Sequence, residues 1–296
     1  MHLINRGIYY EDAYLGVTLG AILSTSGTIM IDAPLRVEDG RNWRSTLLNQ
    51  RGGNNRLLVN LDSHPDRTLG ARAIDCTIIA HQKTAHAFRN RPTIFKGQNA
   101  ESGAVWESYT DAIGMRWSVP DITFSDRMSL HWGNSEIILE HHAGPTAGAI
   151  WAIIPSEKVI FVGDTVIAKQ PPFLANADVE AWLESLEILH ASYRDFILIS
   201  GRGGPLPASA VRDQARALKN VLKGIERLAK RNAPAEATYG LIDGLLADFE
   251  TSEEQRESFV QRLRYGLYHY YLRRYHPSKS NEEPLIEEDE QYPPAK

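Results

Sequence analysis

The stretch of sequence that decides the fold is residues 56–70, RLLVNLDSHPDRTLG. Its apolar first part, residues 56–61, is short enough to be one buried strand, and it leads directly into the polar run 62–67. Residues 69–74 then have the pattern of a helix, and residues 76–80 form a second apolar run. A strand, a helix and a strand within about 25 residues predict a βαβ-like unit, and therefore a fold of the α/β class.

Other strands and helices are predicted on both sides of this unit. Short apolar and β-branched runs that end at turn residues predict strands at 14–23, 28–31, 122–124, 129–132, 136–141, 149–154, 158–162 and 196–199. Apolar residues at helical spacing predict helices at 43–48, 84–89, 105–113, 179–190 and 209–230. A capping box formed by Thr251 and Glu254 predicts the start of a last helix, which runs as far as Tyr275.

The composition limits the classes of protein to consider. With 296 residues, of which 43% are hydrophobic and 23% charged, the chain has the composition of a soluble globular protein with a sizeable core. A net charge of −5 gives no reason to expect electrostatic capture of nucleic acid or of an anionic membrane. The lone cysteine, Cys76, excludes an intramolecular disulfide and a zinc site built from several cysteines. The sequence contains no apolar run of transmembrane length and its N-terminus lacks an apolar leader, so a cytoplasmic location is expected.

Polar residues follow the predicted buried strands in four places, and layered α/β folds build their sites where strands end. The four segments are DSHPDR at 62–67, GPTAG at 144–148, VIFVGDT at 159–165 and SGRG at 200–203. A Gly-Asp pair after a strand is common by itself. The order of all four segments along the chain is therefore more informative than any one of them.

The first segment resembles the signature of the metallo-β-lactamase superfamily, His-x-His-x-Asp-His-x-x-Gly. The spacing matches throughout, and three of the residues, His64, Asp66 and Gly70, agree with the signature. Asp62 stands in the position of the first histidine, and Arg67 stands in the position of the last one.

The other three segments resemble later motifs of the same family. The segment GPTAG resembles Gly-His-Thr-Pro-Gly, with Pro145 in the place of a metal-binding histidine. Asp164 agrees with the aspartate of the family's Gly-Asp segment, which bridges two metal ions. The segment SGRG resembles Gly-His-Gly, with Arg202 in the histidine position. A predicted strand that ends at Asp32 also resembles an early strand of the family, and the whole resemblance covers roughly residues 8–205.

This resemblance implies the fold and a division of the chain. It implies an α/β, four-layer αββα sandwich of the metallo-β-lactamase type, followed by a C-terminal helical extension. We therefore expect a metallo-β-lactamase-like domain over 1–207, a helical extension over 208–276, and a disordered tail over 277–296, which has several prolines and acidic residues and few apolar ones.

The resemblance also implies which residues line the former metal centre. The first metal would keep the ligands Asp62, His64 and a share of Asp164. The second would lose both of its histidines to arginine, which stays protonated and has no lone pair for a metal. We therefore expect the second metal to be absent, and Arg67 and Arg202 to neutralise Asp66 and Asp164 through charge-assisted hydrogen bonds.

Three functions remain open at this point. The favoured one is a non-catalytic or weakly active descendant of a metal-dependent hydrolase, which binds either a small anionic ligand, through its arginine pair, or a protein partner. The alternative is a hydrolase of esters, thioesters or phosphoesters with one divalent metal, Zn, Mn or Fe, held by Asp62, His64 and Asp164. In that enzyme, the catalytic residues would be Asp66, which orients the attacking water, and Arg67 and Arg202, which stabilise the developing negative charge. In the third, the aromatic C-terminal helix forms a homo-oligomer surface and the old site is only structural.

Overall fold

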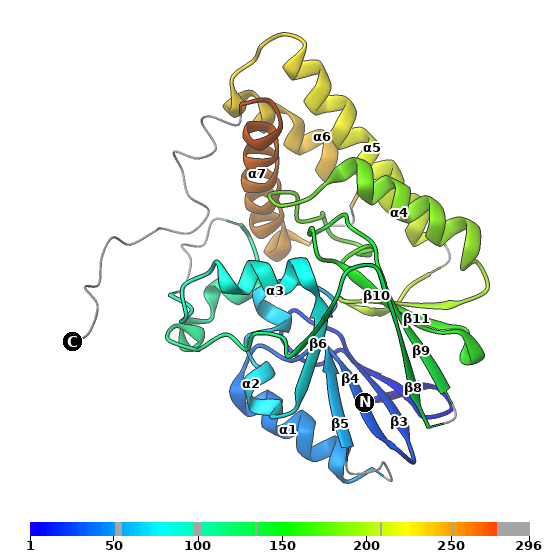
Figure 1. The fold of residues 1–296 in the computed structure, drawn as a ribbon. Coiled ribbons are helices and arrows are strands. Elements are labelled where there is room, and N and C mark those ends of the chain that lie inside the picture. Colours follow the sequence, from blue (N-terminus) through cyan, green and yellow to red (C-terminus); the bar gives the residue numbers. More distant parts are fainter. Residues whose placement is uncertain (51–54, 97–101, 134, 208, 250–251, 277–296) are drawn as a thin grey trace.

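The computed structural model describes residues 1–50, 55–96, 102–133, 135–207, 209–249 and 252–276. Its core is two β-sheets that face each other, with helices on both outer faces (Figure 1). The predicted α/β, four-layer αββα sandwich with C-terminal helices is therefore confirmed. The predicted tail at 277–296 and the predicted capping residue Thr251 lie outside the described residues.

The first sheet has seven strands in sequence order, and it is antiparallel from β1 to β4 and parallel from β4 to β7. Its strands are β1 (His2–Asn5), β2 (Ile8–Glu11), β3 (Leu19–Ser24), β4 (Gly27–Ile31), β5 (Asn55–Val59), β6 (Thr77–His81) and β7 (Ile122–Phe124). The hairpin of β1 and β2 was not predicted from the sequence. The two strands have only four residues each, and most of their residues are partly or fully exposed.

The second sheet has six strands in the order β13-β12-β11-β10-β9-β8, and only the pair of β11 and β12 is parallel. Its strands are β8 (Arg127–Trp132), β9 (Ser135–His141), β10 (Ile150–Ile154), β11 (Val159–Gly163), β12 (Ile197–Ser200) and β13 (Gly204–Pro205). The predicted hairpin between β10 and β11 turns through a short 3₁₀ helix, η4 (Pro155–Glu157).

The alternation of side chains along the strands explains why the two sheets stack. In β11, Phe161 points into the core between the sheets, whereas Ile160 and Val162 point to the core beneath the outer helices. In β4, Ile31 faces the other sheet and Met30 faces the opposite helical layer. Successive residues of a strand point to opposite faces, so strands that are apolar throughout must be covered on both sides.

Seven α-helices occur in the described part of the chain. They are α1 (Val37–Leu48), α2 (Ala71–Ile74), α3 (Gln82–Arg89), α4 (Val179–Ser192), α5 (Ala210–Ala229), α6 (Ile242–Leu246) and α7 (Glu253–Tyr275). Helices α1 and α2 pack on the first sheet, and α4 to α7 share one apolar core with the outer face of the second sheet. Because this core is continuous from the sheet into α5 and α7, the division of the chain at residue 207 stays a prediction. None of the helices in the described ranges is both long and apolar enough to cross a membrane.

The structure corrects the prediction of one helix over 105–113. The segment forms two short 3₁₀ helices, η2 (Val105–Ser108) and η3 (Thr110–Ala112), with extended backbone at Tyr109 between them. The break at Tyr109 lets Trp106 and Ala112 be buried while Tyr109 packs beside them. All three belong to the same apolar cluster, and this packing outweighs the preference for an α-helix.

The start of α7 also differs from the prediction. The side chain of Ser252 caps the helix by accepting a hydrogen bond from the backbone N–H of Gln255, so the cap lies one residue after the predicted Thr251. Two of the tyrosines in this helix, Tyr270 and Tyr271, lie in the core. The prediction of a homo-oligomer formed through the C-terminal helices stays a prediction.

Candidate functional site

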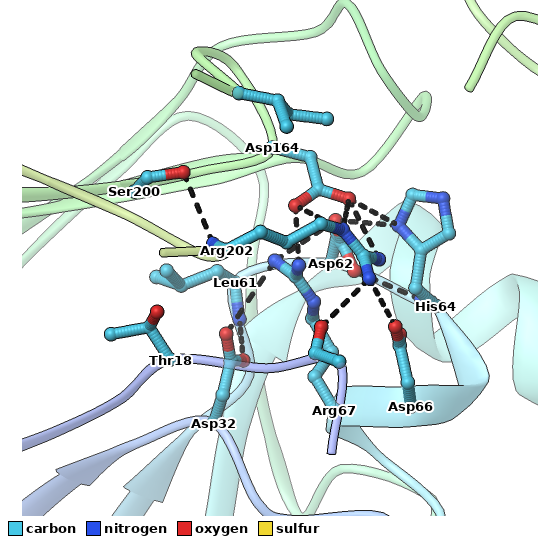
Figure 2. A network of polar contacts seen from close by, with 12 residues as sticks. Thr18, Asp32, Leu61, Asp62, His64, Asp66, Arg67, Asp164, Ser200 and Arg202 are labelled. Atoms are coloured by element: carbon cyan, nitrogen blue, oxygen red, sulfur yellow. Dashed lines mark hydrogen bonds and ion pairs between the residues drawn. The ribbon is translucent and has the colours of Figure 1, made fainter. Parts of the chain in front are cut away.

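The candidate site is a buried cluster of charged side chains at the carboxyl ends of strands from both sheets (Figure 2). Asp32 directly follows β4, and Asp62 follows β5 after two further residues. Asp164 directly follows β11, and Arg202 follows β12 after a single glycine. The short 3₁₀ helix η1 (Pro65–Arg67) then brings Asp66 and Arg67 back over the end of the first sheet.

Arg67 is the central cation of the cluster and has 0% of its surface exposed. Its Nη2 donates a hydrogen bond to Oδ1 of Asp164 on the second sheet. Its Nη1 lies 3.5 Å from Oδ2 of Asp62 and 3.6 Å from Oδ2 of Asp32. One guanidinium group therefore joins carboxylates from three strand ends and ties the two sheets together.

Arg202 is the second cation, and it is 6% exposed. Its Nε lies 3.1 Å from each carboxylate oxygen of Asp164. Its Nη1 donates to Oδ2 of Asp66 and, at 2.8 Å, to the carbonyl oxygen of Gly16. The two predicted pairings, of the arginines with Asp164 and with Asp66, are therefore both present.

His64 lies at the edge of the cluster with 16% of its side chain exposed. Its Nδ1 is 2.8 Å from Oδ2 of Asp62 and 3.6 Å from Oδ2 of Asp164. Its backbone N–H donates to Oδ1 of Asp62 at 2.9 Å. Ligand atoms of Asp62, His64 and Asp164 all lie within 4.8 Å of one another, so these three residues have the placement of a candidate metal-binding group.

The electrostatics of the cluster favour full ionisation around the arginines. Burial raises the pKa of Asp62, but Arg67 and His64 outweigh burial and hold that pKa below its ordinary value. Burial likewise opposes ionisation of Asp164, and Arg202 and Arg67 lower its pKa in spite of it. For His64, burial lowers the pKa, but the carboxylate of Asp62 outweighs it, so the imidazole gains its proton more readily than usual.

Asp32 behaves differently from the other carboxyl groups. Burial raises its pKa to about 7, and the attraction of Arg67 only partly offsets this. Its Oδ1 accepts the backbone N–H of Leu61 at 2.9 Å, whereas its Oδ2 has no hydrogen-bond partner in the described structure. Its backbone has a φ of 59°, a left-handed conformation that aspartate tolerates better than most residues. Protonation of Asp32 reduces the negative charge around Arg67.

The carboxylate that would bridge metal ions is already fully engaged. Both oxygens of Asp164 accept hydrogen bonds from guanidinium groups, Oδ1 from Arg67 and both from Arg202. Arg67 is also in ion-pair range of Asp62. A divalent cation on Asp62, His64 and Asp164 would therefore lie beside two fixed positive charges, which opposes its binding. Whether Asp66, Arg67 and Arg202 take part in catalysis stays a prediction.

The histidines near the second segment, GPTAG at 144–148, lie apart from this network. His142 stacks on Trp151 with 3.4 Å between ring centroids, and its Nε2 contacts Glu140. His141 stacks on His81 with centroids 3.8 Å apart. Pro145 occupies the motif position itself and offers no side-chain donor or acceptor. Within the described residues, these histidines form no hydrogen bond, ion pair or ring contact with Asp62, His64 or Asp164.

Sequence reasoning missed the aromatic and cationic residues around His64. The ring of Phe173 lies 5.6 Å from that of His64, and it is also covered by the guanidinium groups of Arg202 at 4.7 Å and Arg262 at 4.0 Å. On another side, Arg91 donates from Nη1 to the carbonyl oxygen of Ser63 at 2.8 Å. For Arg262, the sequence contained one sign of burial, its position on the apolar face of a predicted helix.

Comparison with known proteins supports the same fold. A family model described as "Metallo-beta-lactamase superfamily" matches residues 63–201. No curated protein matches the chain in sequence. A metallo-beta-lactamase from Pontibacter korlensis has a similar solved structure, with a TM-score of 0.54 and 18% identity over 72% of this chain and 93% of the other. The DIM-1 metallo-beta-lactamase has a TM-score of 0.56 and 15% identity, over 74% of this chain and 95% of the other.

A longer likeness includes the C-terminal helices. The stereoselective inverting sec-alkylsulfatase Pisa1 from Pseudomonas sp. has a TM-score of 0.65 and 14% identity over 96% of this chain. The chain spans 52% of the length of that enzyme. Likeness at this level of identity shows the fold alone. The family match over residues 63–201, together with the shared two-sheet fold, confirms the predicted resemblance to the metallo-β-lactamase superfamily.

Proposed function

We propose that this chain has the metallo-β-lactamase fold without the dinuclear metal centre that its resemblance to the superfamily implies. We further propose that it is a non-catalytic or weakly active descendant of a metal-dependent hydrolase. The observation that carries the proposal is the engagement of Asp164. Both of its oxygens are bonded to the guanidinium groups of Arg67 and Arg202, which supply the positive charge that metal ions would otherwise bring.

The chemistry of arginine supports this view. A guanidinium group cannot act as a metal ligand or activate a bound water, because it has no free lone pair and stays protonated. It can, however, hold carboxylates in fixed geometry through paired charge-assisted hydrogen bonds. The cluster therefore holds the strand ends of the fold together. Its two arginines do not activate water as the metal ions of a metallo-hydrolase do.

Steady-state hydrolysis assays test this function. The substrates should include a β-lactam, an aryl ester, an aryl sulfate and an aryl phosphodiester, each with and without added Zn²⁺ or Mn²⁺. We expect no rate above that of His64→Ala, a matched variant that removes the only imidazole in the candidate metal group. A metal-stimulated rate that His64→Ala abolishes would instead establish a hydrolase.

The second candidate is a mononuclear hydrolase, and the grouping of Asp62, His64 and Asp164 favours it. Such a site would have one imidazole and two carboxylate ligands, a set suited to Mn, Fe or weakly held Zn. When bound, the metal would lower the pKa of a coordinated water. For this chain to act so, Arg67 would have to give up its contact with Asp62, because that carboxylate cannot serve both cations equally well.

A further inference from the structure

Arg262 is a buried cation that forms no ion pair within the described residues, although Asp164, Asp66 and Glu107 attract it from a longer distance. It comes from α7 and is 3% exposed. Its Nη1 donates to Oε1 of Gln170 at 2.8 Å and to the carbonyl oxygen of Pro171 at 3.1 Å, and its Nη2 donates to the carbonyl oxygen of Gly103 at 3.1 Å. All three acceptors are neutral, and its Nε has no acceptor in the described structure.

This environment contrasts with that of the two arginines in the cluster. Burial and the nearby charge of Arg202 lower the pKa of Arg262 to about 9, whereas carboxylates raise the pKa of Arg67 and of Arg202 in spite of burial. A buried charge that is not paired carries a desolvation penalty that no attraction offsets. Arg262 therefore gains most from an anion that is not part of the described chain.

A second arginine without an ion pair among the described residues bonds to the residue before His64. Arg91 is half-buried, stacks over Trp117 at 4.9 Å and bonds only to the carbonyl oxygen of Ser63. Burial lowers its pKa to about 10. No carboxylate forms an ion pair with Arg91 or Arg262 within the parts of the chain that the structure describes.

Phe173 connects Arg262 to the exposed edge of His64. Its ring covers one face of the Arg262 guanidinium at 4.0 Å and lies 5.6 Å from the imidazole. Phe173 is only half-buried, and an anion that reaches the guanidinium from this side has to displace its ring. An aromatic ring beside a cation suits a ligand that has both an anionic head and an apolar part.

We propose that a small tetrahedral oxyanion, inorganic sulfate or phosphate or a monoester of either, binds beside His64 and Phe173 with Arg262 as its direct partner. Arg91, which bonds to the carbonyl oxygen of Ser63, adds a second positive charge. The predicted anion site at Arg67 and Arg202 is not the one proposed here, because those guanidinium groups already bind Asp66 and Asp164. This proposal goes beyond the proposed function and does not depend on whether a metal is bound.

Isothermal titration calorimetry of the full chain with sulfate and with phosphate, at constant ionic strength, tests this proposal. We expect saturable binding that Arg262→Gln weakens by about tenfold or more, the loss of one charge-assisted partner. Arg91→Gln should weaken it by about threefold, since it contributes charge at longer range. The control is Arg256→Gln, which removes an exposed arginine from the same helix and should leave the affinity within about twofold.

Two results would overturn the proposed anion site. Absence of saturable binding of either anion by the wild-type chain would overturn it, as would equal affinities for wild type and Arg262→Gln. Arg262 also holds neutral groups of the chain, so Arg262→Lys provides a second variant that keeps the charge. We expect Arg262→Lys to bind more tightly than Arg262→Gln. Equal weakening by both, with a matching loss of melting temperature, would assign Arg262 to structure alone.

Discussion

The guanidinium group of Arg67 occupies the space that a side chain at residue 201 would need. A Cβ atom on Gly201 would lie 2.7 Å from both Nη1 and Nη2 of Arg67 and 3.0 Å from its Cζ. The glycine in the SGRG segment therefore provides room for an arginine that comes from the other sheet. Arg67 therefore packs directly against the segment that carries Arg202, the other altered motif position.

Gly201→Ala should displace Arg67 and destabilise the fold. The guanidinium cannot move cheaply, because it is held by carboxylates on several sides, so we expect the free energy of unfolding to fall by about 2 kcal/mol or more. The control is Gly244→Ala in α6, where a Cβ meets nothing within 4 Å and helix propensity favours alanine. Urea denaturation measures both, and a Gly201→Ala chain as stable as wild type would refute this packing.

Arg67→Met should be among the most damaging single substitutions in the chain. It leaves the carboxylates of Asp62 and Asp164 buried without their shared cation, and breaking a buried pair in this way costs about 3–5 kcal/mol. Arg216→Met removes an exposed partner of Asp213 and should change stability by less than about 1 kcal/mol. Thermal denaturation followed by circular dichroism compares the two. Equal effects would show that the cluster contributes no more than a surface pair.

The stability of the chain should decrease as the pH rises from about 4 to about 7. Asp32 has a pKa of about 7 in the folded chain and 3.8 as the reference value, so between these limits the folded protein holds a proton that the unfolded chain has released. The effect amounts to at most about 4 kcal/mol. The raised pKa of His64 acts in the same direction above pH 6.5, whereas the lowered values of Asp62 and Asp164 act only below 3.8.

Asp32→Asn isolates this contribution. It keeps Oδ1 as the acceptor for the N–H of Leu61 and removes the titrating proton. Urea midpoints measured across this pH range should therefore change less steeply than in the wild-type chain. If the two profiles have the same slope, Asp32 is ionised in the folded chain throughout this pH range, which contradicts the prediction.

The double substitution Arg67→His and Arg202→His should create metal binding. It removes the guanidinium groups from both oxygens of Asp164 and supplies imidazole nitrogens at the two positions that the family signature gives to histidine. Zinc titration should show saturable binding in this variant and a higher melting temperature with zinc than without it. Arg67→Gln with Arg202→Gln is the matched control, since it removes the same charges without adding ligands. Zinc binding of equal strength in wild type would contradict the account.

The sequence was sufficient to predict the sandwich and the members of the cluster. Apolar runs such as 159–162 specify strands buried on both faces, and the polar residues after them lie at strand ends that meet in the fold. The pairing of Asp164 with Arg202 was expected because Arg202 stands in the place of a metal-binding histidine, whereas Asp164 agrees with the family motif. Asp32 was noted only as the end of a strand, because nothing in its local pattern shows that its carboxyl lies next to Arg67.

The surroundings of the cluster could not be predicted in the same way. Arg262 lies 60 positions beyond the last motif in sequence, and its contact with Phe173 depends on how α7 packs against a loop. The close approach of Gly266 to Leu174, with a Cβ-to-Cβ separation that would be 3.1 Å, fixes that packing. Such contacts depend on tertiary structure, and local periodicity does not encode them. An arginine on the buried face of a helix was the one sign available.

The measurement that tests the central claim most directly is the metal content of the purified chain. The protein should be produced in medium supplemented with zinc, manganese and iron, purified without chelator, and analysed by inductively coupled plasma mass spectrometry. The account predicts far less than one equivalent of every metal per chain and a melting temperature that a chelator leaves unchanged. One equivalent of metal per chain, together with a chelator-induced fall in melting temperature that His64→Ala abolishes, would contradict it.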